Sequence, residues 1–333
     1  MEKEDLIFVV FISIFVFVSV ALNVVIILVI ATNKHMQTVT YVLITNLAVS
    51  DLLFAGIVVP QNIHDISHSS DFYEGQFACK LVNFLHLFFI ANATYCLVVL
   101  SWERYRAIVK ATKTQFTMRD CKFLVAGTWA LAFAVALPTS IEFEVTWETG
   151  HDGNMNVTSL SCSNQDASNT FIVFNTLLVV VATYLLPFIL MISNYSRVMM
   201  FICHVGRKVK SETGTSPNST NFVVQRKRLR VVAMLATVTV LYGISWLPYF
   251  IVYLLAKLTG NSGSTHNDTA WFQARLALAV FSTMYNFVLY WTFSSQFKEG
   301  LKSLVENTRR YFINRPADET PNISISRRDE TCS

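Results

Sequence analysis

The chain contains 333 residues, of which 53% are hydrophobic and 14% are charged. Because soluble domains average about 25% charged residues, this composition excludes an ordinary soluble protein and indicates a chain embedded in a lipid bilayer. The net charge of +4 is too small to indicate a nucleic-acid partner, and six cysteines in a chain of this length do not predict a disulfide scaffold.

Apolar runs dominate the chain up to residue 293. Most reach the roughly 20 residues that a transmembrane helix needs, and such runs must be helical because strands would leave backbone groups unpaired in lipid. The first run is too long for a signal peptide and lacks a small-residue cleavage site. We therefore predict an all-α membrane protein with a seven-transmembrane helix bundle over 6–293, preceded by a short segment at 1–5. The runs are Leu6–Ala31, Thr40–Pro60, Cys79–Trp102, Phe123–Pro138, Phe171–Tyr195, Leu229–Ala256 and Trp271–Phe293.

Basic residues are concentrated on one side of the predicted membrane. All but four of the 26 lysines and arginines follow the first, third or fifth run or lie in the tail. The positive-inside rule therefore places the N-terminus outside the plasma membrane and the tail in the cytosol. The sequons at Asn156 and Asn267 then lie outside and are expected to carry glycans. The acidic outer loops either serve solvation or attract a cationic ligand.

Asp51 lies in the middle of the second run. A carboxylate at that depth is costly and is by default a functional candidate. It could hold a cation, carry a proton, or be protonated and hydrogen-bonded to Asn23 and Asn286. A purely structural polar contact between helices is the alternative.

The third run begins at Cys79 and leads into Glu103, Arg104 and Tyr105. The 25 residues from Cys79 to Arg104 span roughly 37 Å as a helix, enough to cross a hydrocarbon core of about 30 Å. Cys79 and Cys162 both lie on the oxidising outer side, where a disulfide would fix the second outer loop; two free thiols are the alternative. Arg104 could be a snorkelling anchor, but the adjacent Glu103 favours a restrained ion pair.

Trp246 and Pro248 lie in the sixth run, and Pro187 lies in the fifth. Proline kinks a helix by removing a backbone donor, which suits a pivot. The alternative is that prolines are simply common in membrane helices.

Together these motifs resemble those of rhodopsin-like (class A) G-protein-coupled receptors over about residues 6–306. The matching residues are Asn23, Asp51, Cys79, Glu103, Arg104, Tyr105, Trp129, Cys162, Pro187, Tyr195, Trp246, Pro248, Asn286 and Tyr290.

The resemblance implies a receptor rather than an enzyme. An agonist would bind among the outer halves of spans three, five, six and seven, and span six would swing outward around Pro248 with Trp246 at the pivot. Arg104, Tyr195 and Tyr290 would rearrange to open a cytosolic cleft for a heterotrimeric G protein. The resemblance also implies a short amphipathic helix eight on the membrane surface at 294–307. The cytosolic tail at 308–333 would then recruit receptor kinases and arrestin.

Two departures concern helix geometry and the bundle core. Phe287 replaces the family's proline in span seven, so the local kink should be weaker because Phe keeps its N–H donor. Thr94 and Tyr242 stand where a branched aliphatic residue and a phenylalanine are more common.

Two further departures concern an ion and a restraint. A sodium ion near Asp51 is the one candidate cofactor, and Ala93, where a serine is common, argues against it. Arg228 stands where some relatives have an acid that pairs with Arg104, and it would repel Arg104 instead. We therefore predict appreciable basal activity.

Several features bear on the ligand. Segments 34–41 and 242–249 resemble receptors for neuropeptide FF, galanin, orexin and neuropeptide Y. We predict a neuropeptide ligand, with a small non-amine molecule as the alternative. His86 could contact the ligand or be a satisfied core residue, and Arg275 could meet a ligand carboxylate or a loop acid. The predicted pocket residues are Gln61, His86, Leu87, Asn175, Tyr249, Tyr253, Phe272 and Arg275.

A transporter or channel is the rival from another class. Transporters usually show internal repeats and several midplane polar residues, and neither is evident here. The basic run at 225–230 serves either topology and lipid contact or G-protein contact.

Overall fold

The computed structural model describes residues 3–67, 75–110, 115–152, 155–163, 169–213, 220–259 and 269–313. Its helices are α1 (Lys3–Thr32), α2 (Val39–Leu53), α3 (Val59–Ser67), α4 (Gly75–Ile108), α5 (Met118–Glu142), α6 (Asn169–Val180), α7 (Leu186–Thr213), α8 (Thr220–Thr259), α10 (Thr269–Phe293) and α11 (Ser295–Ile313). The strands are β1 (Glu144–Asp152) and β2 (Met155–Ser163).

Seven helical stretches in the described chain are long and apolar enough to cross a membrane, which confirms the predicted bundle. The second stretch consists of α2 and α3, joined by a π-helical turn at Phe54–Val58. A similar turn at Val181–Leu185 joins α6 and α7 in the fifth. Each extra-wide turn shifts the side chains that follow it around the helix axis.

The bundle is apolar outside and polar in places inside, as expected of a protein in lipid. Phe17 on α1 is 74% exposed, whereas Ser19 and Asn23 on the same helix are fully buried. Asn23 donates to the backbone oxygen of Thr283 at 2.9 Å, and the hydroxyls of Ser19 and Thr283 lie 2.6 Å apart. These bonds fasten α1 to α10.

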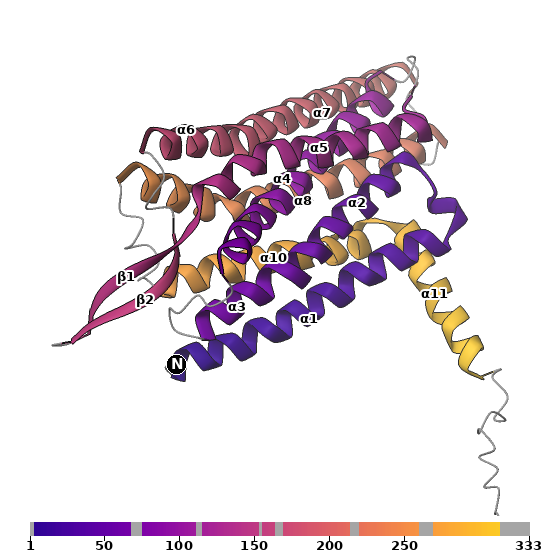
Figure 1. The fold of residues 1–333 in the computed structure, drawn as a ribbon. Coiled ribbons are helices and arrows are strands. Elements are labelled where there is room, and N and C mark those ends of the chain that lie inside the picture. The colour runs from indigo at the N-terminus through magenta and orange to yellow at the C-terminus, as the bar shows by residue number, and fades with distance from the viewer. Residues whose placement is uncertain are drawn as a thin grey trace, which may run out of the picture.

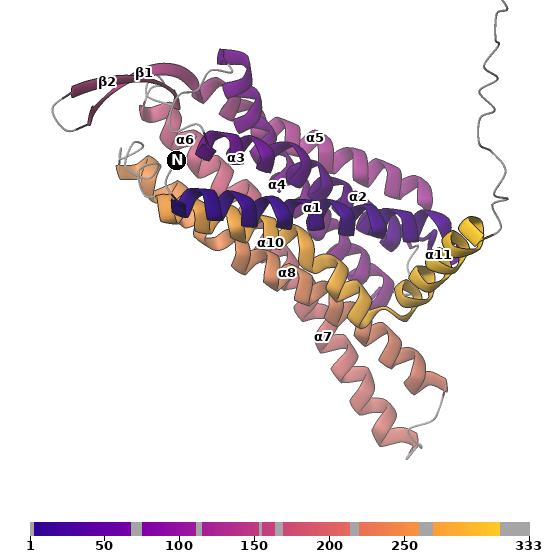
Figure 2. The ribbon, with the colours of Figure 1, turned by 90° about the horizontal axis from the view of Figure 1, so that it is seen from below.

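The helices lie side by side in one elongated bundle (Figures 1 and 2). The antiparallel β1–β2 hairpin projects from the end at which α1 begins, which we call the hairpin end. The sequence predicts an outer loop here, whereas the structure forms two paired strands. At the opposite end, which we call the α11 end, α11 turns away from α10.

The predicted helix eight corresponds to α11. It buries Phe297 and Gly300 and exposes Glu299 and Lys302 on its other side. A Cβ atom at Gly300 would lie 3.0 Å from the Asn33 amide nitrogen, so a glycine allows α11 to approach the end of α1 closely.

Candidate functional site

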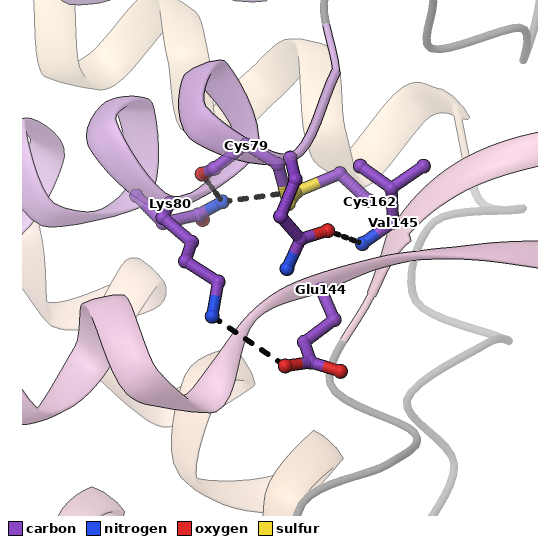
Figure 3. The surroundings of a disulfide bond; sticks show 7 residues. Cys79, Lys80, Glu144, Val145 and Cys162 are labelled. Carbon is purple, nitrogen blue, oxygen red and sulfur yellow. Dashed lines mark hydrogen bonds and ion pairs between the residues drawn. A yellow bond between two sulfur atoms is a disulfide. The ribbon is translucent and has the colours of Figure 1, made fainter.

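The predicted disulfide between Cys79 and Cys162 joins α4 to β2, with a Cα–Cα distance of 5.7 Å. Lys80 Nζ lies 3.4 Å from Glu144 Oε1 on β1, beside this bond (Figure 3). The backbone N–H of Val145 on β1 donates to Gln76 Oε1 on α4 at 2.8 Å. The hairpin is therefore fixed against the first turns of α4 by the disulfide on β2 and by these two contacts on β1.

Four of the predicted pocket residues meet near the hairpin end. The rings of His86 on α4 and Tyr249 on α8 stack at 5.4 Å, and Tyr249 stacks on Tyr253 at 5.9 Å. Arg275 Cζ on α10 lies 5.5 Å from the centre of the Tyr249 ring. We call these four residues the hairpin-end cluster. It combines aromatic surface with one positive charge.

His86 has a polar atom that the described protein does not satisfy. Its Nε2 atom is buried without a hydrogen-bond partner, a state that costs free energy unless a ligand or water supplies the bond. The edge of Phe54 contacts the His86 ring at 5.5 Å. This atom is therefore a candidate contact for a ligand.

The other predicted pocket residues lie around this cluster or outside the described side chains. Leu87 is 4% exposed and belongs to the main apolar core, against which Tyr249 and Tyr253 also pack. Gln61 is half-buried on α3. The side chain of Phe272 lies outside the described ones. Asn175 on α6 is fully buried and donates to Glu142 Oε2 at 2.7 Å.

Glu142 is a candidate site residue that the sequence analysis missed. The fourth apolar run ends at Pro138 in the sequence, which puts Glu142 among the acids of the outer loops that serve solvation or attract a cationic ligand. In the structure α5 continues through Pro138 to Glu142, whose side chain is fully buried. Glu142 interacts electrostatically with Tyr249 and Tyr253 of the cluster.

Asp51 and Asn286 form the polar centre of the bundle. Asn286 Nδ2 donates to Asp51 Oδ2 at 2.7 Å, which joins α2 to α10. The alternative in which Asp51 is bonded to both Asn23 and Asn286 is seen only for Asn286, because Asn23 donates to the backbone of Ser19 and Thr283 and its Oδ1 has no partner in the described chain. Asn23 therefore joins α1 to α10 through the Thr283 backbone.

The polar centre offers an incomplete set of ligands for a sodium ion. Carboxylate and amide oxygens suit hard cations, and Asn286 Oδ1 is buried without a hydrogen-bond partner in the described chain. Asp51 accepts the Asn286 bond at Oδ2, which leaves Oδ1 for a cation, and Ala93 supplies no side-chain oxygen. A sodium ion at this site stays a prediction.

A column of contacts runs from the hairpin-end cluster into the bundle. The Trp246 ring lies 5.6 Å from Tyr249 and 5.9 Å from Tyr242, all on α8. Thr94 Oγ1 on α4 then donates to the Tyr242 hydroxyl at 3.1 Å. Trp246 and Pro248 both lie in the uninterrupted helix α8. Thr94 and Tyr242, the two residues that differ from the family's common ones, are therefore hydrogen-bonded to each other.

Arg104 is held in an ion pair at the α11 end. Arg104 Nε lies 2.5 Å from Glu103 Oε2, and the guanidinium also donates to the Thr40 hydroxyl. Thr40 donates to Glu103 Oε2 at 3.3 Å. The predicted restraint on Arg104 is thus present, and Thr40 on α2 takes part in it.

A cavity of about 370 Å³ opens beside this ion pair. It is lined by α2, α4 and α8 and by the junction of α10 with α11; the lining includes Thr40, Glu103, Arg104, Met234 and Ser294. The cavity brings a restrained charge into contact with space that a second molecule can enter.

The remaining predicted residues are distributed around this end. Tyr195 lies near Arg104, and Tyr290 lies near Tyr195. Tyr105 faces away and packs against a satellite apolar cluster formed by Ile108, Val198 and Val232. The side chains of Arg228 and Asn156 and all of Asn267 lie outside the described part of the chain.

Comparison with known proteins identifies similar chains. A profile of the family described as "7 transmembrane receptor (rhodopsin family)" matches residues 22–290. Neuropeptide FF receptor 1 of Rattus norvegicus is 27% identical, over 84% of this chain and 66% of the relative. Tachykinin-like peptides receptor 99D of Drosophila melanogaster is 27% identical, over 86% and 54%. Substance-K receptor of Bos taurus is 25% identical, over 86% and 72%. The chain thus spans less than two thirds of the length of the first two relatives.

Proposed function

Because the chain belongs to the rhodopsin family of seven-transmembrane receptors, we propose that it is a peptide receptor that activates a heterotrimeric G protein. The observation that carries the proposal is the column of contacts along α8, which begins at the hairpin-end cluster and leads into the bundle. A ligand at one end and a partner at the other would both bias the position of this helix.

The hairpin end is proposed to face the extracellular side. Arg104, Lys110 and Arg197 lie toward the α11 end, as the positive-inside rule requires of a cytosolic face. The disulfide, the hairpin and the sequons at Asn156 and Asn267 would then be extracellular. The cavity beside Arg104 would face the cytosol.

A peptide is the proposed ligand because the similar receptors are named for peptides and the cluster suits one. Stacked rings at His86, Tyr249 and Tyr253 can receive an aromatic or apolar side chain. The buried carboxylate of Glu142 attracts a basic group, and Arg275 attracts a carbonyl or carboxylate oxygen. A peptide can contact both side chains at once.

The G protein would bind where the cavity lies. An agonist activates only if it binds one arrangement of the bundle more tightly than the other. In the active arrangement α8 would move outward at the α11 end, enlarging the cavity of about 370 Å³. Arg104 would leave Glu103 and approach Tyr195 and Tyr290. Receptor kinases and arrestin are proposed to act on the tail.

A peptide panel tests the proposal. Cells expressing the chain are exposed to neuropeptides, and G-protein dissociation is recorded by energy transfer between labelled subunits. We expect at least one peptide to act, and Tyr249→Ala to lower its potency at least tenfold, equivalent to about 1.4 kcal/mol. The matched control is Phe77→Ala, which removes an exposed aromatic ring near the start of α4, at the hairpin end. Activation by small molecules alone would contradict the peptide assignment.

A further inference from the structure

Tyr105 on α4 has two cationic side chains beside its ring. Lys110 Nζ lies 5.4 Å from the ring centre, and Arg197 Cζ on α7 lies 5.8 Å from it. Both distances fall within the roughly 6 Å over which a cation is attracted to an aromatic ring. Because Tyr105 packs against Ile108 and Val198, the ring is a fixed platform. It gathers two positive charges from different parts of the chain.

These two charges lack a carboxylate partner among the side chains that the structure describes. The described ion pairs include neither Lys110 nor Arg197. By contrast, Arg106, the neighbour of Tyr105, interacts electrostatically with Asp120. Like charges repel, so an anion that contacts both would be favoured.

Arg197 lies on the side of α7 that faces lipid, which indicates a lipid headgroup as the source of such an anion. Leu190 and Phe201, seven residues before it and four after it, lie on the same side of α7 by helical periodicity. They are 44% and 37% exposed, as lipid-facing side chains are. A guanidinium between them must extend toward the headgroup layer. Lys110 follows the end of α4 at Ile108 by two residues, which places it at the same boundary.

We propose that Lys110, Tyr105 and Arg197 form a binding site for the phosphorylated headgroup of an anionic lipid. Arg197 can donate two parallel N–H bonds to a phosphate, and Lys110 supplies a compact charge. A phosphate monoester carries about 1.5 to 2 negative charges, so it matches two cations better than a serine headgroup does. In the proposed orientation the lipid belongs to the cytosolic leaflet; its binding depends on neither the orientation nor signalling.

Lipid binding to the full-length receptor in detergent micelles tests the site. The probe is fluorescent short-chain phosphatidylinositol 4,5-bisphosphate, followed by anisotropy. We expect saturable binding that the double variant Lys110→Gln/Arg197→Gln weakens about tenfold, because two charge-assisted bonds are lost. The matched control is Lys122→Gln/Lys302→Gln, which removes two exposed charges at the same end. It should change the affinity less than about twofold.

Further variants distinguish the site from general attraction. Tyr105→Phe keeps the ring and should bind like the wild type, whereas Tyr105→Leu should bind a few-fold more weakly. If the double variant lowers the unfolding temperature, Arg197→Lys replaces it; it keeps the charge, loses the paired donors, and should weaken binding several-fold.

Four results would overturn the proposal. Absence of saturable binding is the first, and equal losses in the two double variants, which indicate diffuse charge, are the second. The third is equal affinity for short-chain phosphatidylserine. The fourth is tighter binding of a phosphorylated peptide from the 308–333 tail, which would make the occupant a protein segment.

Discussion

Thr94 on α4 and Tyr242 on α8 are joined hydroxyl to hydroxyl at 3.1 Å, and the Tyr242 hydroxyl donates in turn to the backbone oxygen of Ile90 at 3.1 Å. Both side chains are buried. The Thr94 hydroxyl, which also lies 2.9 Å from the Ile90 oxygen, supplies the Tyr242 oxygen with a donor in a part of the bundle where water cannot replace the bond. Any outward rotation of α8 must lengthen or break this contact, so the pair restrains the proposed moving helix.

Thr94→Val should raise ligand-independent signalling. Valine keeps the shape of threonine but cannot donate to Tyr242, and a buried hydrogen bond contributes about 1 kcal/mol, equivalent to roughly fivefold in a two-state population. The measurement is G-protein dissociation without ligand at matched surface expression. Thr128→Val is the control, because Thr128 bonds only within α5, to the Val125 oxygen. Unchanged basal signal in Thr94→Val would show that the bond does not oppose activation.

Glu103→Gln should raise basal signalling modestly, by about twofold. The change removes the charge that holds Arg104 at 2.5 Å, but the glutamine amide keeps an oxygen that can still accept a hydrogen bond from the guanidinium. The same cell assay reports it. Glu299→Gln removes an exposed acid at the same end of the bundle and should have no effect. A fall in basal signal after Glu103→Gln would mean that the ion pair supports the active arrangement instead.

Glu142→Gln should lower the potency of a basic peptide agonist about tenfold or more. The amide keeps an oxygen for the 2.7 Å bond from Asn175 but removes the buried charge that attracts a cation, and removing one partner of such a pair costs 2 kcal/mol or more. Dose–response curves measure it. The control is Glu144→Gln, which removes a partly exposed acid that pairs with Lys80. Equal effects of the two variants would indicate steering by overall charge, not contact at Glu142.

Loss of the Cys79–Cys162 disulfide should lower stability and ligand binding together. The bond closes a segment of 83 residues, and loops of that size correspond to about 4.5 kcal/mol in the chain-entropy model. The unfolding temperature of the Cys79→Ser/Cys162→Ser variant in detergent should fall by several degrees, and its agonist binding should be weaker. Cys203→Ser removes an exposed free thiol and should change neither quantity. Retained binding in the double variant would mean that the hairpin is not part of the ligand site.

Hydrophobicity and charge were sufficient to predict the seven spans, because the lipid requirement acts on every residue of a long run. The ends of the helices were less predictable. Pro138 was read as a stop, although α5 continues to Glu142. The π-helical turn at Phe54–Val58 leaves no signal in an apolar run, since every face of such a segment reads as hydrophobic.

Contacts between distant residues were the least predictable part of the site. Thr94 and Tyr242 were noted separately as unusual residues, but only the packing of α4 against α8 shows that they bond. The sequence leaves a bond between Asn23 and Asp51 open as one alternative, and the structure shows that the Asn23 amide donates to the backbone of α10. Hydrogen-bond partners depend on helix rotation, which apolar periodicity does not define to within one side chain.

The position of α8 relative to α5 tests the central claim most directly. Spin labels are attached at Arg230 and Arg119, two exposed positions near the α11 end, after Cys203 and Cys332 have been replaced by serine. Distance distributions are recorded by pulsed electron resonance with and without an active peptide and G protein. The account predicts a new population at longer distance when both are bound, and a larger share of it in Thr94→Val. An unchanged distribution with the peptide bound and the G protein activated would contradict the account.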